Sequence, residues 1–187
     1  METRRIRLRE VTKEDLPTIF EWRNTEKFRF LFHHNENIIN YDEFCEEFIC
    51  DMTVRKFQYI IETTTTCKLV GLTFIHSFSE VENYCFFNVF FDERYEGKGY
   101  GVDAFALFSY FLFNSAGIKK IYVEAFEYNI RSLSFIRKSG MKEIEVLRNK
   151  KLHLEKEYDI LRFSCDNSLL PTIIALKEKL SLPKSHL

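Results

Sequence analysis

Apolar and polar residues alternate in several short runs along the chain, and such runs predict β-strands. Residues 4–9 place Ile6 and Leu8 between charged residues and predict a half-buried strand at the edge of a sheet. Residues 57–62 and 68–78 are apolar runs on either side of the polar sequence TTTT, which predicts an antiparallel hairpin. Further strands are predicted at residues 83–91, 119–126, 141–147 and 155–164.

Helical spacing of apolar residues predicts helices between these strands. Thr12 and Asp15 have the spacing of a capping box, and apolar residues follow them at helical intervals. Residues 24–40 lack a clear period and are interpreted as a long, partly ordered loop, the kind of segment in which substrate contacts often lie. Further helices are predicted at residues 41–52, 99–117 and 129–139.

Several of the predicted strands carry apolar residues on both faces, which indicates a sheet covered by helices on each side. This pattern predicts an α/β (α+β) fold with one mixed sheet of six to seven strands. A length of 187 residues suits one domain, predicted over residues 1–167. Residues 168–187 are expected to form a C-terminal helical tail.

Charge and cysteine usage narrow the environment of the protein. Lys+Arg 27 against Asp+Glu 28 leaves no basic field that would attract nucleic acid or an anionic membrane. Five cysteines without a CxxC pair predict free thiols and no metal site. The N-terminal sequence METRRIRLRE is unlike a signal peptide, and the longest apolar stretch, residues 104–113, is far shorter than a membrane span. We expect a cytoplasmic protein.

Three glycines, Gly97, Gly99 and Gly101, lie between the strand at 83–91 and the helix that follows it. Glycine permits sharp turns that bring backbone N–H groups close to an anion, and the helix adds its positive N-terminal end. The spacing is not that of a P-loop, because Lys98 is followed by another glycine. A Rossmann turn would follow the first strand rather than a run of antiparallel strands. The sequence therefore predicts a phosphate site of another kind.

The pattern R-x-x-G-x-G at residues 94–99 resembles the pyrophosphate-binding motif of the GNAT acyl-CoA N-acyltransferases. Residues 129–141, with the sequence NIRSLSFIRKSGM, are similar to a second signature of that superfamily, with Met141 where Phe is usual. The resemblance extends over residues 4–165. Similarities to its RimJ/RimL-like branch occur in WRN at residues 22–24, in Leu147-Arg148 and in Tyr158-Asp159.

This resemblance implies a GNAT-like fold with acetyl-CoA as cosubstrate. Backbone N–H groups of residues 97–101 would receive the pyrophosphate, and backbone groups of the preceding strand would pair with the pantetheine amides. Asn129 and Ser132 would face the thioester end, although Asn129 also has the residue type of a helix cap. The implied cofactor-binding residues are Val89, Phe91, Arg94, Gly97, Lys98, Gly99, Tyr100, Gly101, Asn129 and Ser132.

The resemblance also implies direct attack of a neutral amine on the acetyl thioester, which needs a base and a proton donor for the thiolate. The sequence departs from the pattern here, because many relatives have Glu at the position of Phe86 and Tyr at the position of Ile136. A lone histidine on a strand is more often a solvated or hydrogen-bonded bystander than a catalytic group, and a strand glutamate can as well be a carboxylate at the rim of the cleft. The candidate substitutes are Ser132, Glu124 and His76, with Tyr84, His33 and His34 as further alternatives.

We therefore predict an acetyl-CoA-dependent N-acetyltransferase that acts on a primary amine. A small molecule such as an amino sugar, an aminoglycoside or an amino-acid derivative is the first choice of acceptor, and a protein N-terminal or side-chain amine the second. Residues 24–40 and the helix after them are expected to line the acceptor site without a strong acidic cluster, which argues against a polyamine. A homodimer is left open. The rival functions are a catalytically silent CoA-binding module and a nucleotide-binding protein.

Overall fold

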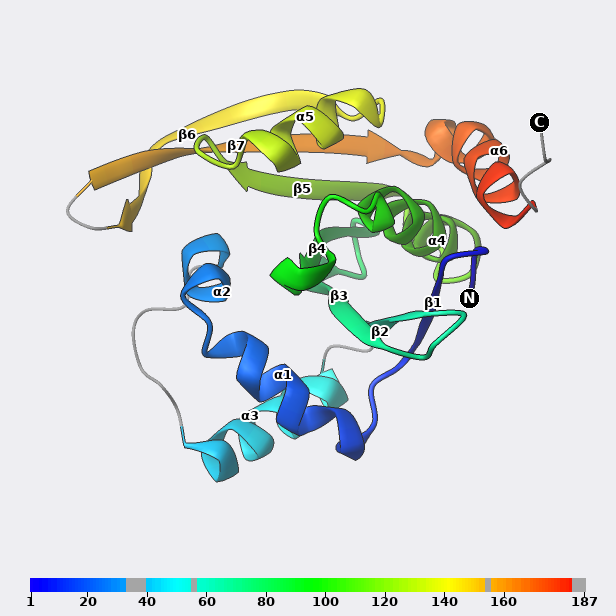
Figure 1. Ribbon diagram of the computed structural model, residues 1–187. Helices are drawn as coiled ribbons and strands as arrows, with labels where there is room; N and C mark the ends of the chain where they lie inside the picture. Colours follow the sequence, from blue (N-terminus) through cyan, green and yellow to red (C-terminus); the bar gives the residue numbers. More distant parts are fainter. Residues whose placement is uncertain (33–39, 55–56, 154–155, 183–187) are drawn as a thin grey trace. The chain divides into compact units, whose positions relative to one another are not determined.

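The structure is a computed structural model, and it describes residues 1–32, 40–54, 57–153 and 156–182. The side chains of residues 50–54 and 151–153 lie outside this description. Its strands are β1 (Ile6–Glu10), β2 (Gln58–Thr63), β3 (Leu69–Ser79), β4 (Tyr84–Phe91), β5 (Lys120–Phe126), β6 (Lys142–His153) and β7 (Lys156–Asp166). Its α-helices are α1 (Leu16–Arg23), α2 (Glu26–Leu31), α3 (Tyr41–Val54), α4 (Tyr100–Asn114), α5 (Ile130–Lys138) and α6 (Leu170–Ser181), joined by short 3-10 turns at Lys13–Asp15, Glu93–Tyr95 and Asn167–Leu169 (Figure 1).

The strands form one seven-stranded sheet in the order β1-β2-β3-β4-β5-β7-β6. β1 with β2, β3 with β4 and β6 with β7 are antiparallel. β4 and β5 are parallel, with Tyr84 opposite Lys120 and Phe86 opposite Tyr122. The expectation of a mixed sheet with helices between its strands is therefore confirmed.

The chain divides into two compact units. Unit 1 comprises Met1–Glu10, Tyr59–Tyr122 and Cys165–Leu187. Unit 2 comprises Val11–Gln58 and Val123–Ser164. Strand β5 begins in unit 1 and ends in unit 2, so both units depend on one continuous strand.

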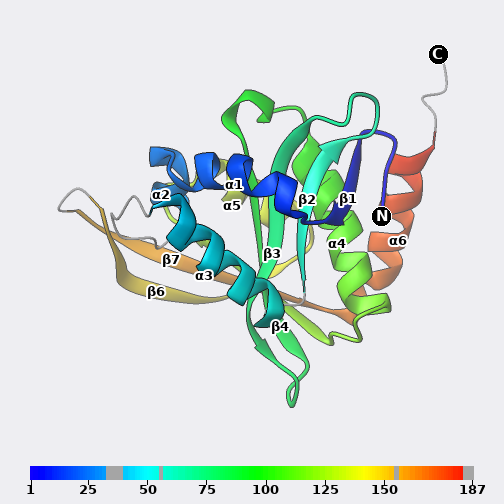
Figure 2. The ribbon, with the colours of Figure 1, turned by 90° about the horizontal axis from the view of Figure 1, so that it is seen from below.

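The core of unit 1 is built on α4, which packs against β1 and α6 (Figure 2). Residues 104–109 of this helix are buried on every face, and the ring of Phe108 lies 5.2 Å from that of Phe87 on β4. Helix α6 buries Ile173, and the Lys177 ammonium lies 4.7 Å from the Tyr110 ring of α4. The expected C-terminal tail is thus a helix that packs on α4, while the boundary at residue 167 stays a prediction.

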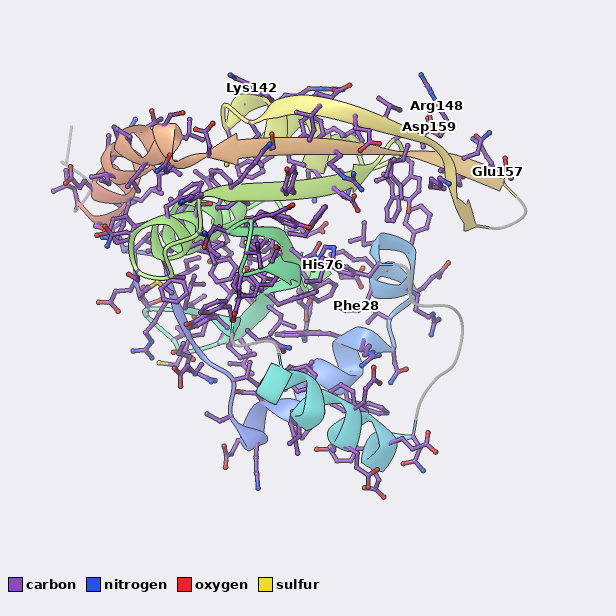
Figure 3. All side chains as sticks on the ribbon, turned by 180° about the vertical axis from the view of Figure 1, so that it is seen from behind. Phe28, His76, Lys142, Arg148, Glu157 and Asp159 are labelled. Carbon is purple, nitrogen blue, oxygen red and sulfur yellow. The ribbon has the colours of Figure 1, made fainter. Side chains whose placement is uncertain are left out.

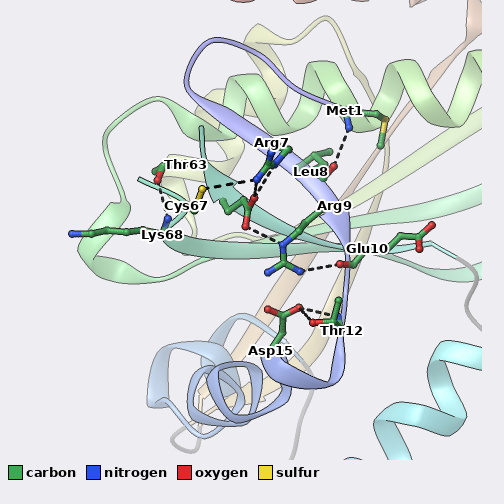
Figure 4. Close-up of polar contacts among 11 residues, drawn as sticks. Met1, Arg7, Leu8, Arg9, Glu10, Thr12, Asp15, Thr63, Cys67 and Lys68 are labelled. Carbon is green, nitrogen blue, oxygen red and sulfur yellow. Dashed lines mark hydrogen bonds and ion pairs between the residues drawn. The ribbon is translucent and has the colours of Figure 1, made fainter. Parts of the chain in front are cut away.

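In unit 2, α1 packs against α2 and α3, and aromatic side chains join α1 to α3. Its start follows the predicted capping box, in which the Thr12 backbone N–H donates to Asp15 Oδ2 at 2.8 Å (Figure 4). The Phe20 ring of α1 lies 5.3 Å from that of Phe44 on α3, and Phe44 is fully buried. Aromatic contacts therefore join helices that are too short to be stable alone.

The interpretation of residues 24–40 as one loop is wrong over α2. Thr25 caps this helix, because its hydroxyl oxygen accepts from the Phe28 backbone N–H at 3.1 Å. The rings of Phe28 and Phe32 then pack 4.5 Å apart, one helical turn from each other. Aromatic residues at nearly every second position hid the helical period in the sequence. Residues 33–39, which include His33, His34 and Glu36, lie outside the described residues.

The strand predicted at 141–147 is longer in the structure, because β6 continues to His153. The pairing register of β6 with β7 shifts between Leu147 and Lys151, and Asn149 has a left-handed φ of 51°. This irregular segment consists of exposed polar residues, so the alternation that predicts a strand stops at Leu147 although the pairing resumes.

Candidate functional site

The glycine-rich segment of unit 1 forms a tight loop between β4 and α4. Gly97 and Gly99 have left-handed φ angles of 73° and 79°, which side chains with a Cβ rarely adopt. A Cβ at Gly99 would lie 3.1 Å from Nη1 of Arg5, whereas one at Gly97 would meet nothing within 4 Å. The loop therefore needs glycine for its conformation, and its backbone is open at Gly97.

The backbone N–H groups of this loop are available to a ligand. In the part of the chain that the structure describes, the N–H groups of Gly97, Lys98 and Gly99 donate no hydrogen bond. Gly99 is also the N-cap of α4, whose first N–H groups have no acceptor within the helix. A row of free N–H donors at the positive end of a 15-residue helix fits a phosphate or pyrophosphate.

Two cationic side chains lie on the loop beside Tyr95. Lys98 is exposed, and its ammonium lies 4.8 Å from the Tyr95 ring. Arg94 donates through Nε to Asp92 Oδ1 at 3.0 Å and pairs through Nη2 with Oδ2 at 2.5 Å, although its side chain is 73% exposed. Asp92 thus anchors Arg94, and both cations remain at the surface of the loop.

Strand β4 carries Val89 and Phe91, which were expected to pair with pantetheine. Val89 lies opposite Thr73 of β3, and Phe91 lies opposite Gly71. A Cβ at Gly71 would come within 2.1 Å of the Phe90 carbonyl oxygen, so only glycine permits this approach of the two strands. The position of β4 before the loop depends on that contact, and pairing with pantetheine stays a prediction.

In unit 1, His76 lies beside Phe86, the residue at the position where many relatives have Glu. His76, labelled in Figure 3, lies on β3. Its ring lies 5.2 Å from that of Phe86, and its Nδ1 contacts Nδ2 of Asn88. The Phe86 ring stacks on Tyr122 of β5 at 5.0 Å. Asn88 is not among the residues predicted from the sequence. Strand register could have identified it, because alternate residues of β3 and β4 share a face, but a lone asparagine in an apolar strand gives no signal of its own.

In unit 2, Asn129 is the N-cap of α5. Its Oδ1 accepts from the Ser132 backbone N–H at 3.1 Å, so the alternative interpretation of Asn129 as a helix cap is correct. The Ser132 hydroxyl is not used in this cap, and its side chain is half-buried. Ile136, one turn further along, is buried and is part of the core. Contact of Asn129 and Ser132 with a cofactor stays a prediction.

Glu124 on β5 belongs to a network of charges across the sheet. Arg162 of β7 donates through Nε to Glu124 Oε1 at 2.7 Å. The Nη1 group of Arg162 binds Oε2 of Glu145 on β6 at 2.5 Å. The Arg162 guanidinium thus holds the Glu124 carboxylate and joins the three neighbouring strands β5, β7 and β6. Its role as a base stays a prediction.

Tyr84, a further candidate from the sequence, has an aromatic partner. The Tyr84 ring lies edge-on to Tyr122, 5.4 Å away, at the start of β4. Cys85 and Cys165 are buried, and burial raises the pKa of each thiol to about 12, so both stay protonated at neutral pH.

No group of three or more His, Cys, Asp or Glu side chains among the described residues could hold a metal ion. None of the described helices has the length and apolar character needed to cross a bilayer.

Comparison with solved structures agrees with this architecture. The spermidine N-acetyltransferase of Vibrio cholerae, solved with CoA and spermine, matches with a TM-score of 0.82 and 17% identity, over 87% of this chain and 96% of that chain. A chimera of the same enzyme with hSSAT over K23-Q34 matches with a TM-score of 0.78 and 16% identity, over 89% of this chain and 98% of that one. At such identity the likeness shows the fold alone.

Comparison with protein families goes further. No curated protein matches the sequence. The family model described as acetyltransferase (GNAT) domain matches residues 5–142, which is well over half of the chain. This range contains the glycine loop, strand β4 and helix α5. The chain therefore belongs to the GNAT acetyltransferase family.

Proposed function

We propose that the protein transfers an acetyl group from acetyl-CoA to the primary amine of a small molecule. The observation that carries this proposal is the glycine loop, in which left-handed Gly97 and Gly99 present free N–H groups at the start of α4. Membership in the acetyltransferase family supports the assignment of this anion as the pyrophosphate of an acyl-CoA. Lys98 and Arg94 would add positive charge beside it.

The remaining donor contacts follow from the family resemblance. Backbone groups at Val89 and Phe91 would pair with the amides of the pantetheine arm, and residues Tyr100 and Gly101 would add first-turn N–H groups to the pyrophosphate. Asn129 and Ser132 would contact the thioester end. The close approach of Gly71 to β4 supports the contact of Val89 and Phe91 with pantetheine, because it fixes the position of β4 before the loop.

Acetyl transfer needs a neutral amine, a donor for the developing oxyanion and a proton for the departing thiolate. His76 is suited to donation. If Asn88 donates its amide N–H to Nδ1, a neutral imidazole carries its proton on Nε2, from which it would donate to the oxyanion. We assign His76 as a hydrogen-bond donor, and Ser132 as the first candidate to protonate the thiolate. Glu124 ranks lower because Arg162 already holds its carboxylate.

The acceptor is proposed to be an amine with more than one positive charge. The expectation that the acceptor segment lacks an acidic cluster is wrong, because α3 contains Asp42, Glu43, Glu46, Glu47 and Asp51 and no Lys or Arg. The described members of this set are exposed, and one of them, Glu47, pairs with Arg23 at 3.0 Å. Polyamines and aminoglycosides both carry several positive charges that complement these carboxylates. The V. cholerae protein with a similar fold is a spermidine N-acetyltransferase.

The proposal is tested by thiol release from acetyl-CoA in the presence of spermidine, an aminoglycoside, glucosamine and a peptide with a free N-terminus. Turnover with the polycationic amines in preference to the peptide is the expected result. Preference for the peptide would favour the RimJ/RimL-like branch, which stays a prediction from the sequence. The homodimer also stays a prediction. CoA binding without turnover of any amine would contradict the proposed enzymatic activity and favour a catalytically silent CoA-binding module.

A further inference from the structure

We infer that Arg5 of β1 is a positioning residue that aims the N–H groups of the glycine loop at the pyrophosphate, with Asp103 and Thr3 holding it in place. This inference rests on the proposed function, because it concerns the same anion site. Arg5 lies outside the family's glycine motif and 94 residues from Gly99 in the sequence. Its side chain is 32% exposed, so it is only partly open to solvent.

The first step is the contact of Arg5 with the loop itself. Nη1 of Arg5 donates to the Lys98 carbonyl oxygen at 3.0 Å, and Nη2 donates to the Gly99 carbonyl oxygen at 3.0 Å. In a planar trans peptide the C=O and the next N–H point in opposite directions. Because Arg5 draws two consecutive carbonyls toward itself, the N–H groups of Gly99 and Tyr100 must point away from it. Both belong to the proposed pyrophosphate site.

The second step is the support of Arg5 by a buried carboxylate. Asp103, in the first turns of α4, is 0% exposed and accepts from Arg5 Nε at 3.3 Å. It also forms an ion pair with Arg5 Nη2 and accepts from the Thr3 hydroxyl at 2.6 Å. A buried carboxylate with these partners fixes the orientation of the guanidinium plane. Strand β1, the loop and α4 are therefore joined at one side chain.

The third step concerns the chemical requirements at positions 5 and 99. A Cβ at Gly99 would lie 3.1 Å from Arg5 Nη1, so a larger residue there would displace the guanidinium as well as strain the left-handed backbone. Lysine could not replace Arg5, because one ammonium cannot reach two carbonyls and a carboxylate with the planar geometry of a guanidinium. The arrangement thus needs arginine at 5 and glycine at 99.

If the Arg5–Asp103 pair only stabilised the fold, its loss would impair the reaction with every acetyl donor. If Arg5 orients the pyrophosphate site, its loss would spare an acetyl donor that has no pyrophosphate. The test variant is Arg5→Gln combined with Asp103→Asn, which removes both charges and leaves no unpaired buried carboxylate. Arg5→Lys is the conservative variant. Arg7→Gln is the matched control on the same strand, because Arg7 binds Glu62, which keeps Arg9 as its other partner (Figure 4).

CoA affinity is measured by calorimetry, and kcat/KM is measured with acetyl-CoA and with S-acetylpantetheine. We expect CoA binding about tenfold to hundredfold weaker in the double variant and in Arg5→Lys, as for loss of one or two charge-assisted hydrogen bonds. The rate with S-acetylpantetheine should stay within about twofold of wild type, because this donor has no pyrophosphate to hold. Arg7→Gln should match wild type with both donors.

Wild-type CoA affinity in the double variant would overturn the inference. An equal loss with both donors would also overturn it, since this result would show general damage to the fold. A wild-type protein that neither binds CoA nor releases thiol from either donor would instead contradict the proposed function, on which the inference rests.

Discussion

The Tyr128 hydroxyl donates a hydrogen bond to the Phe30 carbonyl oxygen at 2.6 Å, and the two aromatic rings stack 4.0 Å apart. This pair joins the last turn of α2 to the residue before the cap of α5 within unit 2. Burial raises the pKa of the Tyr128 phenol, so the hydroxyl stays protonated and can donate at physiological pH. The pairing connects the aromatic segment after Thr25 with the segment that carries Asn129 and Ser132.

Tyr128→Phe should therefore destabilise the protein by about 0.5–1.5 kcal/mol, because it removes the hydrogen bond from the Tyr128 hydroxyl to the partly buried Phe30 carbonyl while it keeps the ring stack. The free energy of unfolding in urea is the measurement. Tyr84→Phe is the control, since in the described part of the chain the Tyr84 hydroxyl has no hydrogen-bond partner. Equal stability of the Tyr128→Phe variant and wild type would show that the bond makes no net contribution.

Acid should weaken unit 2 through Asp159. The Asn149 backbone N–H donates to Asp159 Oδ1 at 3.0 Å, and Arg148 pairs with the other oxygen (Figure 3). The hydrogen bond from Asn149, followed by that from Arg148, lowers the pKa of the Asp159 carboxyl, although burial opposes the shift. A lowered pKa in the folded state contributes stability above the unfolded pKa, about 4, and that contribution disappears as the pH falls through the folded pKa.

Asp159→Asn should accordingly lower stability at neutral pH and make unfolding less dependent on pH in the acid range. Urea unfolding between about pH 6 and pH 2 compares the slopes of wild type and variant. Glu157→Gln, at an exposed site two residues away on β7, serves as the control and should leave the slope unchanged. Identical slopes for wild type and Asp159→Asn would remove Asp159 from the acid response.

Ser132→Ala tests the proposed proton donor for the thiolate. The change keeps the cap of α5, because Asn129 accepts from the backbone N–H of residue 132 and not from its hydroxyl. We expect kcat to fall about tenfold to a hundredfold, while CoA affinity changes little. Ser134→Ala, an exposed site on the same helix, should retain full activity. A wild-type kcat in Ser132→Ala would exclude this hydroxyl from the reaction.

His76→Phe tests the second assigned donor. The change keeps an aromatic ring beside Phe86 but removes both ring nitrogens, and with them the Nε2–H group. We expect kcat to fall by about tenfold or more, as for loss of one hydrogen-bond donor to a developing charge. Asn88→Ala should reduce kcat in the same direction by a smaller factor, because it frees the ring tautomer and orientation. Full activity of both variants would identify His76 as a bystander on the sheet.

Much of the fold followed from the sequence, because alternation and cap residues are local signals. The strands at 57–62 and 83–91, the capping box at Thr12 and the glycine loop all lie where they were predicted. Helix α2 did not follow, because its aromatic residues mask the helical period. Arg5 and Asn88 did not follow either, since their roles come from contacts with distant residues that no local pattern records.

The central claim is that the glycine loop binds the pyrophosphate of acetyl-CoA, and calorimetric titration with CoA tests it most directly. Gly99→Asp places a carboxylate at the proposed anion site, and Gly117→Asp makes the same change at another left-handed glycine, with a φ of 70°, beyond the other end of α4. We predict that wild type and Gly117→Asp bind CoA with the same affinity and that Gly99→Asp, although folded, shows no binding. CoA binding by Gly99→Asp with wild-type affinity would contradict the account.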